Sequence, residues 1–108
     1  MGIPELQHQV EAIERLVNLV TIDAISTGQS CISDDTDPLK KVITFNLITP
    51  IPDDLHSRMR KMIKSQLWTD YTACGKVTFS RHTLRVGVYL KGLRRPAWTP
   101  KEMSEDES

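Results

Sequence analysis

The sequence predicts an α+β domain in which helices cover one face of a small three-stranded sheet, antiparallel or mixed. Two patterns support this prediction. Apolar residues recur at helical spacing in residues 4–24 and 52–68, and they alternate with polar residues in 40–49, 76–81 and 83–90. The composition, 39% hydrophobic and 26% charged, is typical of folded chains rather than disordered ones. We therefore expect one packed core.

The first predicted element is an N-terminal amphipathic helix, to which we assign residues 1–25. Pro4 suits a first helical turn, and Glu5 suits the positive end of the helix dipole. Apolar residues at alternating spacings of three and four form a seam, which packs against either its own domain or a second copy. The residues that we assign to self-association through this seam are Leu6, Val10, Ile13, Val17 and Val20.

Residues 26–38 are predicted to form an acidic loop or linker. The segment is rich in Ser, Thr, Asp, Gly and Pro, and Ile32 is its only large apolar residue. Asp34, Asp35 and Asp37 lack the glycine and the distal glutamate of a calcium-binding loop. No metal site is therefore expected here.

Residues 39–95 are predicted to form a basic core of strand, helix and hairpin. The strand ends at Pro50, and the helix begins near Pro52 with acidic residues in its first turn. A turn-like TDYTACG segment precedes the hairpin, whose strands are 76–81 and 83–90. We assign residues 1–101 to a single α+β domain, with residues 96–108 as a disordered acidic tail that overlaps its end.

The sequence carries no signature of catalysis. It lacks GxGxxG, GxxxxGK[ST], HExxH and GxSxG, so the common phosphate-binding, zinc-hydrolase and serine-hydrolase motifs are missing. His8, His56 and His82 fall in separate elements, and Cys31 and Cys74 lack CxxC spacing. We therefore expect no enzyme activity, catalytic residue, metal, cofactor or small-molecule substrate.

Charge is strongly segregated along a chain whose net charge is zero. Residues 1–37 hold seven acidic residues and one arginine, a net charge of −6. Residues 38–101 hold thirteen basic and three acidic residues, a net charge of +10, and residues 102–108 hold four acidic residues and no basic one, a net charge of −4. Such asymmetry indicates an anionic partner or pairing between charged segments.

Nine basic residues of the second helix, the hairpin and its exit form the candidate surface for an anionic partner. They are Arg58, Arg60, Lys61, Lys64, Arg81, Arg85, Lys91, Arg94 and Arg95. Converging on one surface, they would attract phosphates, and Tyr71, Tyr89 and Trp98 are available to stack on bases. No helix-turn-helix, zinc-finger or RNP1-like segment is present. The partner therefore stays open among nucleic acid, a nucleoprotein and an anionic membrane surface.

The predicted function is that of a non-enzymatic, self-associating binding or assembly protein that contacts an anionic macromolecule, for example a small viral or phage structural or accessory protein. Exposed edges of a three-stranded sheet favour a homo-oligomer, dimer or higher. The alternative is a protein adaptor or inhibitor that binds an acidic protein surface through a sheet edge or the apolar helix seam. Because the sequence shows no transmembrane segment and no secretory leader, we expect an intracellular (cytoplasmic) protein, with the periphery of a membrane or a viral particle as special cases.

Overall fold

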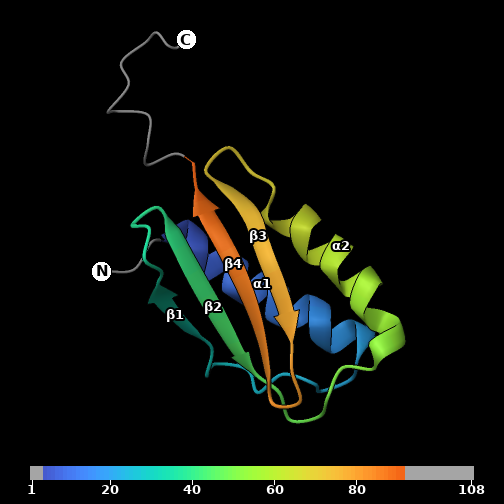
Figure 1. The fold of residues 1–108 in the computed structure, drawn as a ribbon. Coiled ribbons are helices and arrows are strands. Elements are labelled where there is room, and N and C mark those ends of the chain that lie inside the picture. The colour runs from blue at the N-terminus through green and yellow to red at the C-terminus, as the bar shows by residue number, and fades with distance from the viewer. Residues whose placement is uncertain (1–3, 92–108) are drawn as a thin grey trace, which may run out of the picture.

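The computed structural model describes residues 4–91, which form an α+β fold of two α-helices and a four-stranded antiparallel sheet (Figure 1). A short 3-10 helix, Asp53–Leu55, directly precedes the second α-helix. The elements follow in the order α1 (Pro4–Val20), β1 (Cys31–Asp34), β2 (Lys40–Asn46), α2 (His56–Leu67), β3 (Thr72–Phe79) and β4 (Thr83–Leu90). The predicted α+β class is confirmed, with one strand more than expected.

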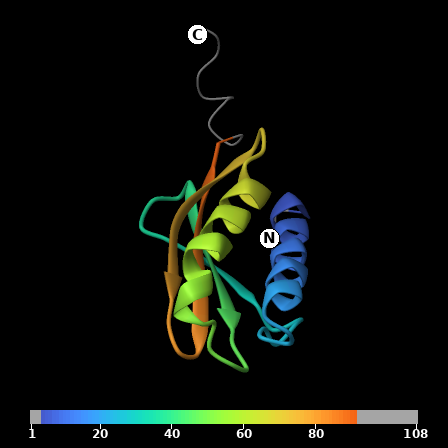
Figure 2. The same cartoon turned by 90° about the vertical axis from the view of Figure 1, so that its right-hand side faces the viewer.

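Both helices pack on the same face of the sheet, and the described residues leave its other face open (Figure 2). The strand order is β1-β2-β4-β3, and α2 runs beside β3 at one edge. Side chains alternate along β4, so that Leu84, Val86 and Val88 are buried while Arg85 and Tyr89 point outward. The core therefore lies between the sheet and the helices, and α2 contributes the fully buried Ile63 to it.

The additional strand is β1, which lies inside the segment predicted to be a loop. All four of its residues are exposed, so it has no apolar pattern that would indicate a strand. It pairs with β2 from Cys31 opposite Thr44 to Asp34 opposite Lys41, and the last two side chains form an ion pair. Pairing with β2 in a hairpin, rather than local propensity, therefore forms this strand.

Helix α1 ends at Val20, four residues before the end predicted from its apolar pattern. Asp23 has a φ of 54°, in the left-handed region, so the chain turns there instead of continuing the helix. The backbone N–H of Ile25 then donates to the Asn18 side chain at 2.8 Å, and Ile25 pairs with Leu47. Ala24 and Ile25, which follow the turn, therefore enter the core on a segment that pairs with Leu47, and not as part of the helix.

Strand β3 begins at Thr72, four residues earlier than predicted. The buried Thr72 hydroxyl donates to the carbonyl of Leu67 at 2.7 Å, which ties the start of the strand to the end of α2. The register between β3 and β4 shifts between Cys74 and Val77, so Gly75 lies in an irregular strand and not in the turn expected for it. The predicted tail, residues 96–108, lies outside the described residues.

Candidate functional site: a basic ridge and a groove on the open sheet face

The nine predicted basic residues do not all lie on one surface. The α2 residues Arg58, Arg60, Lys61 and Lys64 are exposed on the helix layer. Arg85 points from β4 to the open face on the other side of the sheet, because residues at odd positions of this strand face outward. Arg81 lies in the β3–β4 turn and Lys91 just past β4, whereas Arg94 and Arg95 lie outside the described residues.

Four of these cations follow the edge where α2 lies beside β3, and we call this set the α2–β3 ridge: Arg81, Arg60, Lys64 and Lys91. At one end, the ring of Phe79 stacks on the ring of His56 with centroids 4.0 Å apart and planes 6° apart. The Arg60 guanidinium lies 5.1 Å from the same phenyl centroid, a cation–π contact. Arg81 lies in the β3–β4 turn two residues after Phe79, so its backbone is near the same end of the ridge as Arg60.

Lys64 belongs to the middle of the ridge and Lys91 to its far end. Lys64 is exposed in the last turn of α2, the helix that packs beside β3. The Lys91 ammonium lies 4.1 Å from the ring centroid of Trp68, the residue that caps α2. Trp68 itself is 72% exposed. Cations and aromatic rings therefore alternate along this edge.

The positive charges of the ridge have no carboxylate partner within the described range. Among residues 4–91, Lys41 is the one lysine or arginine within ion-pair distance of a carboxylate, that of Asp34. Helix α2 itself contains no acidic residue between His56 and Leu67. Unneutralised cations on one edge produce a local positive potential even when the net charge of a chain is small.

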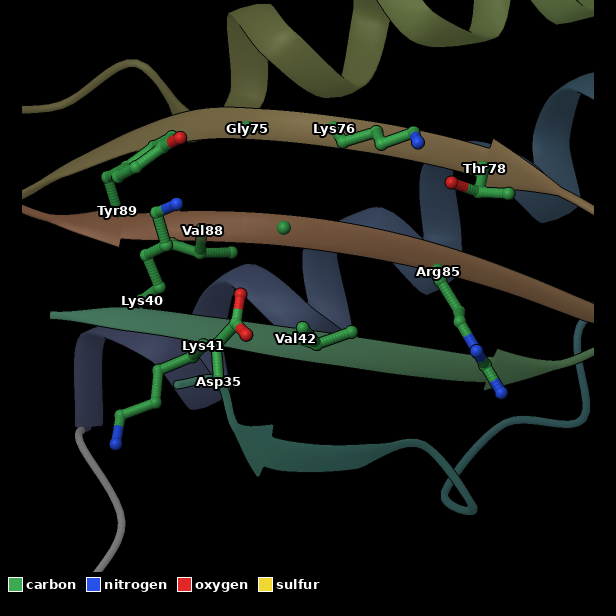
Figure 3. Close-up of a pocket in the computed structure, with 11 residues that line it drawn as sticks. Asp35, Lys40, Lys41, Val42, Gly75, Lys76, Thr78, Arg85, Val88 and Tyr89 are labelled. Atoms are coloured by element: carbon green, nitrogen blue, oxygen red, sulfur yellow. The ribbon is translucent and has the colours of Figure 1, made fainter. Parts of the chain in front are cut away.

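The open face of the sheet carries a hollow of about 370 Å³, which we call the sheet groove (Figure 3). Lys40 and Tyr89 lie at one end, and Arg85 lies at the other end. Lys76 and Thr78 line the side formed by β3. The register explains this shape, because Lys40 pairs with Tyr89 across β2 and β4, while Thr78 pairs with Arg85 across β3 and β4.

The middle of the groove is hollow because its central row has small side chains. Gly87 of β4 lies opposite Val42 of β2, and Gly75 lies in the irregular part of β3. A Cβ on Gly87 would come within 3.2 Å of the Lys76 backbone nitrogen. A Cβ on Gly75 would come within 3.0 Å of the Tyr89 ring, so both glycines permit close approach.

The groove was missed in the sequence because its members are brought together by strand pairing. The outward positions of β4, Arg85, Gly87 and Tyr89, alternate visibly along the chain and indicate one column of the surface. Lys40 and Lys76 come from two other strands, and only the register places them beside that column. The sheet order was not predicted, so neither was this neighbourhood.

The α1 seam assigned to self-association packs within its own domain, which is the first of the two alternatives given for it. Leu6, Val10, Ile13 and Val17 are at most 3% exposed, and Val20 packs partly against the same core. The helix uses this face to cover its own sheet and to contact α2, where Gln66 donates to Gln9 at 2.8 Å. A second copy has no access to the seam while the domain is folded.

Within residues 4–91 no three His, Cys, Asp or Glu side chains come together in a group suited to a metal ion. Neither helix in that range combines the length and apolar character that crossing a bilayer requires.

Comparisons with protein-family models, with curated proteins and with solved structures found no match to this chain.

Proposed function

We propose that this protein binds an anionic macromolecule through the α2–β3 ridge and acts by binding rather than by turnover. The observation that carries the proposal is the row of cations along one edge, none of which pairs with a carboxylate in the described part of the chain. A macromolecule with regularly spaced phosphates matches such a row better than a single small anion does, because it neutralises several cations at once.

Nucleic acid fits the ridge because cations and rings are interleaved on it. Trp68 and Tyr71 are 72% and 54% exposed and lie near Lys91, whose backbone N–H donates to the Tyr71 carbonyl at 2.7 Å. Exposed rings beside cations bind single strands by stacking and charge together. An anionic membrane surface is the competing partner, since Trp and Tyr also favour lipid headgroups.

Salt dependence tests the proposal. Affinity of the full chain for a labelled oligonucleotide is measured by fluorescence anisotropy over a range of salt concentrations, with phosphatidylserine vesicles as a second probe. Four phosphate contacts predict that the logarithm of the affinity falls with the logarithm of salt concentration with a slope of about −2.8 to −3.6. Arg60→Gln removes one ridge contact and should reduce the size of that slope by about 0.7 to 0.9.

Arg15→Gln is the matched control, because Arg15 is an exposed arginine on α1, away from the ridge. It should leave the slope unchanged. Equal slopes for the two variants would show that the ridge is not the binding surface. Stronger binding to vesicles than to the oligonucleotide, with the same sensitivity to Arg60→Gln, would keep the ridge and replace the partner.

The alternative function, an adaptor or inhibitor that binds an acidic protein, is supported by the free edge that β1 has in the described part of the chain. Its helix seam is buried, but the outer edge of β1 carries the exposed residues Cys31 to Asp34 and has no neighbouring strand among the described residues. Such an edge accepts an extended peptide as a further strand. A complex formed there would be held mainly by backbone hydrogen bonds, so its affinity should change little with salt.

A further inference from the structure

The structure assigns a second site: we propose that the sheet groove binds one nucleotide unit, with the base against Tyr89 and the phosphate on Arg85 and Lys76. The unit is either a free nucleotide or one residue of a single strand. The inference extends the proposed function and rests on it for the second of these sources, but the groove lies on the open face and uses none of the ridge residues.

The dimensions of the groove fit a nucleotide better than a bare phosphate. Its volume of about 370 Å³ is in the range of small-molecule sites. Arg85 and Tyr89 are four residues apart on one strand, which separates their positions by about 13 Å. A phosphate held at the Arg85 end would leave the Tyr89 end empty, whereas a nucleotide reaches both.

Charge in the groove favours an anion. Lys40, Lys41, Lys76 and Arg85 line it, and Lys41 forms an ion pair with Asp34. Three cations therefore stand against a single lining acid, Asp35, whose carboxylate accepts the Thr36 N–H at 2.7 Å. Arg85 presents a planar guanidinium, which can donate two parallel hydrogen bonds to a phosphate. A neutral ligand would leave three cations unused, so the phosphate is the part that explains them.

The opposite end of the groove favours a flat ring. Tyr89 is 42% exposed, and the Lys40 ammonium lies 5.1 Å from its ring centroid. The ring itself lies over Gly75, and because Gly87 has no side chain, a planar group can lie next to this ring in the middle of the groove. Aromatic rings on sheet surfaces bind bases by stacking without regard to sequence.

The experiment is an NMR titration of the full chain with three probes: inorganic phosphate, thymidine monophosphate and a short oligothymidylate. We expect the amides of Gly75 and Gly87 to shift with either nucleotide probe. Arg85→Gln and Tyr89→Leu should each weaken nucleotide binding about tenfold, a typical value for one stacked base or one good phosphate contact. Arg58→Gln removes an exposed arginine from α2 and should have no effect on these shifts.

The other possible outcomes of the titration distinguish the sheet groove from the α2–β3 ridge as the binding site. If phosphate binds as tightly as the nucleotides and Tyr89→Leu changes nothing, the groove is an anion site and the proposal is overturned. Oligothymidylate binding that depends on Arg60 but not on Arg85 or Tyr89 overturns the groove and leaves the ridge intact. Failure of all three probes to shift the glycine amides also overturns it. Tight binding of the oligothymidylate alone, with loss in both groove variants, identifies the strand as the source.

Discussion

The buried carboxylate of Glu14 fastens the segment before β1 to α1, and its removal gives a sharp stability prediction. Glu14 is 6% exposed and accepts the Ser30 hydroxyl at 2.6 Å and the Gly28 N–H at 3.3 Å. A hydrogen bond to a charged group contributes about 1.5–3 kcal/mol, and the longer bond contributes about 0.5 kcal/mol. Glu14→Ala should therefore lower the free energy of unfolding by about 2–3 kcal/mol.

The assay is urea unfolding followed by circular dichroism, with amide hydrogen exchange as the local readout. Two or more kcal/mol corresponds to a fall in Tm of about 10 °C in a domain of this size. The amides of β1 should exchange faster in Glu14→Ala, because Ser30 directly precedes that strand. Glu11→Ala is the control, since Glu11 is exposed and its side chain accepts, among the described residues, only the Gln7 amide at 3.4 Å.

A double-mutant cycle tests the mechanism. Ser30→Ala alone should cost about 1.5–3 kcal/mol and should add almost nothing in the Glu14→Ala background, because the shared hydrogen bond is already gone. A loss in Glu14→Ala no larger than that in Glu11→Ala would refute the reasoning. So would fully additive effects of the Glu14 and Ser30 substitutions.

Two further predictions concern the sheet. Burial raises the pKa of the Cys74 thiol, so near pH 8 less of it is thiolate, and an alkylating reagent should modify the exposed Cys31 at least about tenfold faster than Cys74. Equal alkylation rates of the two cysteines in the native chain would contradict this prediction. Equal rates are expected in urea, where both thiols are exposed. Gly87→Ala should lower the free energy of unfolding by about 1–3 kcal/mol, because the new Cβ meets the Lys76 backbone nitrogen at 3.2 Å; an unchanged urea midpoint would show that the strand yields freely.

The elements that could be predicted from the sequence are those specified by local patterns. The apolar seam of α1 and the alternation of β4 are both visible in the chain, and both elements are present. The end of α1 was misplaced because it depends on a partner distant in sequence, Leu47 for Ile25. The start of β3 was misplaced because it depends on the hydrogen bond from the Thr72 hydroxyl to Leu67 at the end of α2. Strand β1 was missed because its exposed residues carry no apolar alternation, and pairing with β2 forms it.

In the candidate site, too, local spacing predicts some residues, whereas others are brought together only by the fold. The exposed cations of α2 follow from helical spacing, so part of the ridge was predicted as a set. The contact of Lys91 with Trp68 joins the end of β4 to the end of α2, and no pattern in the sequence predicts that pairing. Arg85 was grouped with the helix cations because its facing direction depends on which side of the sheet the helices cover.

The strand order also has a consequence for how the chain folds. Strands β1 and β2 form one hairpin, β3 and β4 form another, and α2 connects them. In the described part of the chain, β2 with β4 is the strand pair that joins segments far apart in sequence. The hairpins can form early at small loop-closure cost, whereas the β2–β4 pairing must bridge about forty residues and is the slow step that we expect to set the folding rate. Phe45 and Leu84, which face each other across that pairing, are the residues through which two local units become one cooperative domain.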